Sequence, residues 1–183
     1  MENTIRYDAP LRQHFDLLSE PGLTGEDPMA IFAKYDGIDG ESNDASHLGW
    51  LDIFAMDWGA HKPDTAIGSG RRRSAAIVED FLLTMGYGKA APKLQEMCLK
   101  GKVIPKLEVE LTTTFAGTRK TYLKYELKNV AIRSFQTNAE GSDEAAPAVI
   151  VANSFEELKV VYTEFDASGS RLGDTESKYK LKS

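Results

Sequence analysis

Residues 105–129 contain two segments in which apolar and polar side chains alternate, and this pattern constrains the fold more than any other part of the chain. In Lys106–Leu111 every second residue is leucine or valine, and in Leu123–Lys128 every second residue is leucine or tyrosine. A period of two is typical of a strand with one buried and one solvated face. Because Gly117 lies between the two segments, the pattern predicts an antiparallel hairpin.

The register of this hairpin can be predicted from its loop and its charges. A three-residue loop, Phe115–Gly117, places glycine where a left-handed backbone is needed. That loop sets Glu108 opposite Lys124 and Lys106 opposite Glu126. A shift of two residues would set Glu108 opposite Glu126, and such a like-charge pair is unfavourable. We therefore predict the first register.

Most other segments are also strand-like, and the period changes to that of a helix only once in the main part of the chain. In Ala91–Lys100 the apolar residues follow helical spacing, with Pro92 in the first turn and Gly101 after the last. A polar loop is expected near residues 137–147 and a flexible turn region at residues 166–177. Further strands are expected at Ala30–Ile38, Gly49–Trp58, Ala75–Met85, Asn129–Gln136, Ala148–Phe165 (bent near Asn153) and Ser177–Lys182.

Seven or eight strands and one helix, joined by short turns, predict a mainly β fold: an antiparallel barrel of two packed sheets with one flanking helix. The 183 residues suit one such domain, with 42% apolar residues to build its core. The net charge of −6 argues against nucleic acid as a partner. A single cysteine, Cys98, excludes an internal disulfide and fits folding in a reducing compartment, and its place on the apolar helix face indicates a buried, inert thiol.

Residues 1–28 are interpreted as an extension that precedes a domain at residues 29–183. Within it, Leu11, Phe15 and Leu18 lie at helical spacing, so Pro10–Ser19 can form a short amphipathic helix. A helix of this length is marginal alone and has to dock on another surface. No basic segment followed by a long apolar run is present, so we expect neither a cleavable signal peptide nor membrane insertion.

An acidic loop at Asp36–Asp44 is the first candidate site, because it offers the carboxylates of Asp36, Asp39, Glu41 and Asp44. Their spacing does not match the EF-hand, so a solvated strand connection is favoured over a metal site. The histidines at positions 14, 47 and 61 are isolated in sequence and form no zinc motif. We predict no metal, no cofactor and no catalytic residue.

Three consecutive arginines, Arg71, Arg72 and Arg73, form the second candidate site. Clustered arginines can bind phosphate groups or acidic protein surfaces. Because the chain is acidic overall and no aromatic residues are interleaved with the arginines, an exposed loop that meets an acidic surface of another protein is favoured over nucleic-acid binding.

Several motifs, taken in order, resemble the haemolysin-coregulated protein (Hcp) family, the tube subunit of bacterial type VI secretion systems. The resemblance covers about residues 29–181, and the shared order of the motifs carries it. These motifs are Gly40–Ser42 after the first strand, Trp58–Gly59 at the end of the second, Gly101–Lys102 after the helix, and the alternating segment Ser154–Tyr162.

The resemblance implies a β-barrel subunit with one helix at its side, six of which form a ring. Rings stack into a tube inside a contractile sheath, and the tube is expelled with a spike and can carry effector proteins in its lumen. The implied protein is not an enzyme, resides in the bacterial cytoplasm before assembly, and is secreted without a signal peptide. In the family, the loop here at Ala60–Ser74 reaches the adjacent ring, so Arg71–Arg73 would meet the acidic loop of a stacked ring.

Three alternatives stay open from the sequence. An Hcp-like effector with hydrolase activity would need a catalytic domain, for which 28 extra residues are too few. A phage-type tail tube protein would share the architecture and also form rings. A small-ligand-binding barrel would need an apolar cavity, which Trp50, Phe54 and Trp58 would tend to fill.

Overall fold

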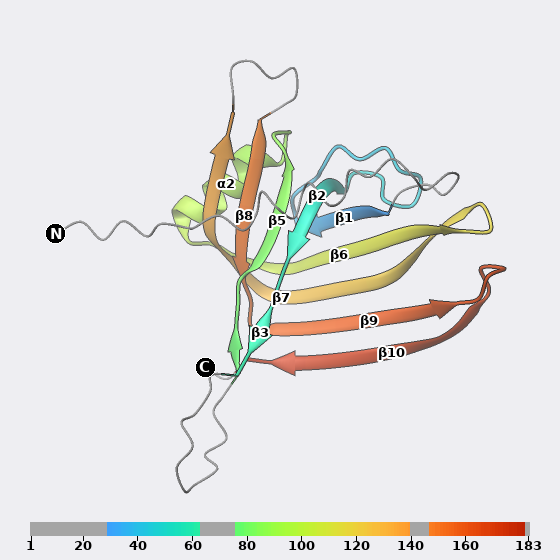
Figure 1. The fold of residues 1–183 in the computed structure, drawn as a ribbon. Coiled ribbons are helices and arrows are strands. Elements are labelled where there is room, and N and C mark those ends of the chain that lie inside the picture. The colour runs from blue at the N-terminus through green and yellow to red at the C-terminus, as the bar shows by residue number, and fades with distance from the viewer. Residues whose placement is uncertain (1–28, 63–75, 140–146, 182–183) are drawn as a thin grey trace, which may run out of the picture.

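A computed structural model of the chain describes residues 29–62, 76–139 and 147–181. Six antiparallel strands close into a barrel in the order β7-β6-β1-β2-β5-β8, and β8 pairs back with β7 (Figure 1). The predicted mainly β barrel with one flanking helix is confirmed. The barrel strands are β1 (Ala30–Tyr35), β2 (Leu51–Asp57), β5 (Phe81–Gly86), β6 (Val103–Phe115), β7 (Thr118–Asn138) and β8 (Ala148–Ser154).

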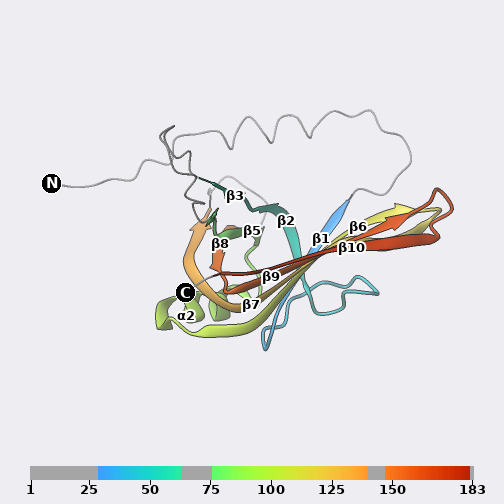
Figure 2. The ribbon, with the colours of Figure 1, turned by 90° about the horizontal axis from the view of Figure 1, so that it is seen from below.

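Two further strands, β9 (Glu157–Phe165) and β10 (Arg171–Lys180), extend the sheet beyond the barrel, and we call them the wing. The wing is possible because β7 has 21 residues: its first half pairs with β6 and β9, and its second half pairs with β8. Seen from below, β6, β7, β9 and β10 form one layer that projects from the barrel (Figure 2). The predicted bend near Asn153 corresponds to the break between β8 and β9. The predicted turn region at 166–177 is wrong from Arg171 on, where β10 begins.

The helix α2 spans Ala91–Lys100, as predicted. Gly101 ends it in the left-handed conformation (φ 59°), and its N–H donates to the carbonyl of Cys98. Leu94 is fully buried and Cys98 half-buried where the helix packs against β7. The predicted strand Ala75–Met85 is instead divided into β4 (Ile77–Val78), which pairs with β3 (Ala60–His61), and β5.

The predicted register of the β6–β7 hairpin is wrong. The turn contains two residues, Ala116 and Gly117, which are both left-handed with φ of 48° and 77°. A bulge between the Leu111–Leu123 and Thr112–Thr121 pairs adds a further residue on β7, so Glu108 faces Glu126. The turn and the bulge together shift the register by two residues, which matches apolar side chains across the inner face.

The like-charge pair in this register is relieved by two lysines: Lys124, which is diagonal to Glu108 and directly opposite Glu110, and Lys106, which precedes Glu108 by two residues on the same strand. Lys124 Nζ lies 2.9 Å from carboxylate oxygens of both Glu108 and Glu110, and Lys106 Nζ lies 2.9 Å from Glu108. Burial raises the pKa of Glu108, but hydrogen bonds from the two lysines outweigh it and hold this pKa below its ordinary value. Because the long side chain of Lys124 reaches both its direct partner Glu110 and the diagonal Glu108, the residue opposite Glu108 does not decide the register.

The barrel interior is filled by buried side chains, among them Tyr35, Phe81 and Leu83. Tyr35 donates a hydrogen bond to Asn153 Oδ1 (2.9 Å), and Asn153 Nδ2 donates to the carbonyl of Phe81 (2.9 Å). Burial raises the pKa of Tyr35 far above its ordinary range. The expectation that Phe54 fills the interior is wrong, because Phe54 lies outside the barrel and is 63% exposed.

Two predicted features, the helix Pro10–Ser19 and the arginines at 71–73, lie outside the described residues. No helix within the described ranges is long and apolar enough to cross a membrane.

Candidate interaction surfaces

The acidic loop, Asp36–Asp44, is the first part of the connection between β1 and β2. This connection, residues 36–50, is closely packed. Backbone hydrogen bonds join Gly40 to Gly49 (2.8 Å) and Ser42 to Trp50 (2.9 Å). A Cβ atom at Gly40 would lie 2.1 Å from the carbonyl oxygen of Trp50, so only glycine fits here. In Figure 2 the loop lies below the layer of strands, whereas β2 and β3 lie above it.

His47 fixes this loop to the barrel wall. Its ring is 3% exposed and stacks on Phe32, with ring centroids 4.1 Å apart and an interplanar angle of 5°. Nδ1 lies 2.9 Å from Asp44 Oδ1, and Nε2 lies 3.0 Å from Glu110 Oε2. Ionised carboxylates only accept hydrogen bonds, so both contacts are hydrogen bonds when each ring nitrogen carries a proton.

The two carboxylates beside His47 have further donors. Thr121 (2.7 Å) and Lys124 (2.9 Å) also donate to Glu110. Burial raises the pKa of Glu110, but the hydrogen bonds from Thr121, His47 and Lys124 outweigh it and leave the pKa below its ordinary value. The hydrogen bond from His47 lowers the pKa of Asp44, which also lies 3.5 Å from Arg119.

The structure divides the four acidic residues that the sequence grouped as a contact surface. Asp44 is occupied by His47 and Arg119, and Glu41 accepts a hydrogen bond from the backbone N–H of Lys89 (3.2 Å). Asp36 and Asp39 are exposed. The roles of His47 and Glu110 were missed, because 63 residues separate them and no local pattern links them.

Within the described ranges, no group of three or more histidine, cysteine, aspartate or glutamate side chains is arranged to hold a metal ion. The three arginines of the second candidate site lie outside these ranges, so the structure neither brings them toward the acidic loop nor separates them from it.

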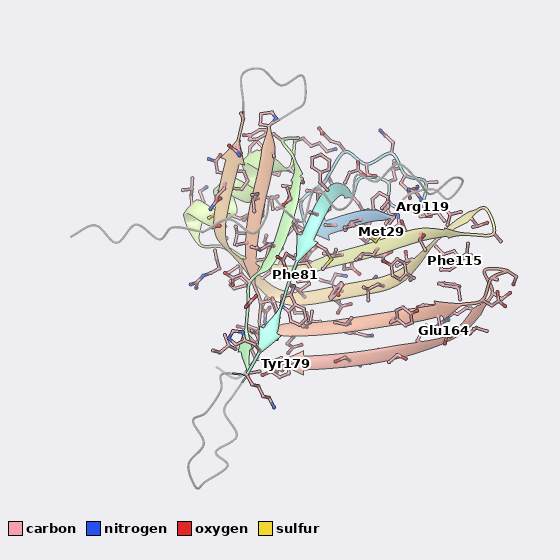
Figure 3. All side chains as sticks on the ribbon, in the orientation of Figure 1. Met29, Phe81, Phe115, Arg119, Glu164 and Tyr179 are labelled. Atoms are coloured by element: carbon pink, nitrogen blue, oxygen red, sulfur yellow. The ribbon has the colours of Figure 1, made fainter. Side chains whose placement is uncertain are left out.

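The wing presents two chemically different faces. On one face, cross-strand pairs place Tyr162 beside Leu123, and Val160 beside Tyr125. Tyr179, labelled in Figure 3, belongs to the same face and is 45% exposed. The other face carries ion pairs that close within the chain: Lys159–Glu176 (2.8 Å), Lys178–Glu176 (2.6 Å) and Lys180–Glu157 (2.8 Å).

An apolar groove lies where the apolar face of the wing meets the β3–β4 hairpin. Trp58 is one of its lining residues and packs against the rings of Phe81 and Phe155, with ring centroids 6.5 Å and 6.4 Å away. The indole Nε1 of Trp58 is buried and has no hydrogen-bond partner among the described residues. The groove is lined by Trp58, Ala60, Ala76, Val78, Tyr125, Leu158, Val160, Ser177 and Tyr179.

Comparison with known proteins finds the same architecture and related sequences. Residues 32–168 match the family model described as "Type VI secretion system effector, Hcp". Protein hcp1 of Pseudomonas aeruginosa is 26% identical over 144 residues, covering 78% of this chain and 88% of that protein.

Two solved structures are also similar. One, described as a type six secretion system protein, has a TM-score of 0.77 and 25% identity, and the match covers 84% of this chain and 96% of that chain. A type VI secretion system effector from Yersinia pestis has a TM-score of 0.65 and 26% identity, with 82% and 99% covered. The barrel, its flanking helix α2 and the extent of the family match lead to one conclusion: this chain belongs to the Hcp family of type VI secretion proteins.

Proposed function

We propose that this chain is a structural subunit of a type VI secretion tube and forms closed six-membered rings through its wing. The observation that carries this proposal is the wing itself, which projects from a barrel that is otherwise closed. All ten residues of β10 are exposed, and β10 forms the free edge of the sheet. A ring needs a heterologous contact between two different surfaces, which a one-sided projection provides.

Several further properties follow from this proposal. The subunit acts as a scaffold and not as an enzyme, and it contacts sheath and spike proteins along the tube. Effector proteins occupy the lumen, and the assembled tube leaves the cytoplasm without a signal peptide. Residues 29–183 form the barrel and wing, while residues 1–28 form a separate extension.

Two exposed leucines allow the ring contact to be tested. Leu172, 61% exposed, lies at the start of β10, and Leu99, 81% exposed, lies on α2. We expect Leu172→Asp to reduce a six-fold particle to monomers in light scattering and negative-stain images, while Leu99→Asp keeps the rings. A ring lost only in Leu99→Asp would move the contact to the helix. A wild-type chain that stays monomeric at all concentrations would refute ring formation.

We also propose that Arg71–Arg73 contact Asp36 and Asp39 of a stacked ring. These two carboxylates are exposed, whereas Asp44 is occupied within its own chain. Reversing the charge of the three arginines should abolish stacking and leave single rings. Asp36→Lys and Asp39→Lys, added to that variant, should restore stacked rings, because the charges on both sides of the contact are then reversed. Stacking that is unaffected by the arginine reversal would contradict this contact.

A further inference from the structure

The apolar groove at the base of the wing contrasts with the opposite face of the wing, which carries ion pairs. Its lining is almost entirely apolar, and Val160 and Tyr179 leave it open on the wing side. Trp58 is one of the lining residues. An open apolar surface of this kind is typical of a site that binds another apolar segment.

Met29, the first residue that the structure describes, lies beside the apolar face of the wing. Met29, labelled in Figure 3, directly precedes β1, and the Tyr122 hydroxyl donates a hydrogen bond to its sulfur (3.1 Å). Tyr122 is the extra residue of the bulge in β7, which interrupts the alternation of faces. Burial and the nearby Tyr162, on the apolar face of the wing, raise the pKa of Tyr122. Residues 1–28 therefore join the barrel at the end of the apolar face that leads to the groove.

The length and pattern of the extension fit this groove. From Tyr162 to Leu158, β9 advances about 13 Å, and a ten-residue helix at Pro10–Ser19 would be about 15 Å long. The nine residues between that segment and Met29 can span up to roughly 30 Å, which is enough to place it over the groove. Its apolar stripe, formed by Leu11, Phe15 and Leu18, can pack against the apolar lining of the groove.

The other segment that borders the groove does not have this composition. Residues 63–75 begin after β3 and end before β4, but they contain Ile67 as their one large apolar residue and three arginines. Apolar burial therefore favours the extension over this loop.

We propose that residues Pro10–Ser19 dock as an amphipathic helix in the groove formed by Trp58, Val78, Tyr125, Val160 and Tyr179 of the same chain. The family match begins at residue 32, so the occupant is a segment that lies outside the shared barrel. The inference does not depend on ring formation, because the contact is intramolecular.

The test measures how accessible Trp58 is in the full-length chain. Trp50→Phe leaves Trp58 as the sole tryptophan, and acrylamide quenching then reports on the groove. In this background Phe15→Asp should increase the quenching constant severalfold and shift the emission to longer wavelength. Gln13→Asp adds the same charge on the opposite face of the helix and should change neither, and Phe15→Leu should behave like the parent.

Two results would overturn the proposal. One is equal quenching in Phe15→Asp and Gln13→Asp, with circular dichroism and thermal unfolding showing that both barrels are folded. The other is a parent chain whose Trp58 becomes shielded only as the protein concentration rises, because that dependence would identify a second copy as the occupant. Shielding that persists across a wide dilution, and is lost only in Phe15→Asp, supports the docked extension.

Discussion

Replacement of His47 by leucine should loosen the acidic loop from the barrel and destabilise the fold. The substitution removes the contacts of both ring nitrogens with Asp44 and Glu110, and a hydrogen bond to a charged group is worth about 1.5–3 kcal/mol. Because Asp44 and Glu110 keep other donors, the lower end applies, and loss of the stack on Phe32 adds about 0.5–1.5 kcal/mol. Leucine recovers part of the apolar contact, so we expect a loss of about 3 kcal/mol in the free energy of unfolding.

Urea unfolding at pH 7, followed by far-ultraviolet circular dichroism, measures this loss. His61 provides the control: its side chain is 56% exposed and lies 3.5 Å from Glu79, so His61→Leu should change the stability by less than about 0.5 kcal/mol. Trp50 contacts His47 edge-on, and its emission should shift in His47→Leu alone. Equal stability of the two variants would refute the interpretation of His47 as the residue that holds the loop.

Three further substitutions test other contacts. Glu110→Gln should be less stable than wild type at pH 7, and the gap should narrow as the pH falls below about 5. The reason is that the pKa of Glu110 is lower in the folded than in the unfolded chain, so the ionised carboxylate stabilises the fold above the unfolded pKa and this contribution is lost on acidification. A stability difference between the two proteins that stays constant as the pH falls would contradict this. Tyr35→Phe leaves Asn153 Oδ1 without its buried donor and should cost about 1–2 kcal/mol in urea unfolding. The same substitution should cost less in an Asn153→Leu background, where that acceptor is absent, and strictly additive losses would argue against a coupled pair. Gly40→Ala, whose Cβ would meet the Trp50 carbonyl, should cost about 2–3 kcal/mol and shift the emission of Trp50, whereas unchanged stability and emission would show that the loop adapts.

The elements that local patterns specify could be predicted from the sequence. The helix was predicted at its observed bounds, because Pro92 and Gly101 mark its two ends and apolar spacing marks its face. The barrel followed from the period-two segments. Bulges and turns are less visible, because the two-residue turn at Ala116–Gly117 requires a left-handed alanine that composition does not suggest.

The contacts between distant segments could not be predicted. His47 was one isolated histidine in the sequence, and only the barrel brings Glu110 to it. The opposite faces of the wing were also hidden, since the first part of β10, residues 171–176, is polar enough to resemble a loop. Its strand character depends on pairing with β9, which is a tertiary effect.

The continuity of β7 has a mechanical consequence. The same strand closes the barrel with β8 and pairs with β9 of the wing, so a pull on the wing along the strand direction reaches the barrel through the β7–β9 hydrogen bonds. The hydrogen bonds of an antiparallel pair lie across the strands, and such a pull therefore loads many of them in shear at the same moment. In a particle built from these subunits, each subunit would resist such a force as one unit, and the contacts between subunits would break first.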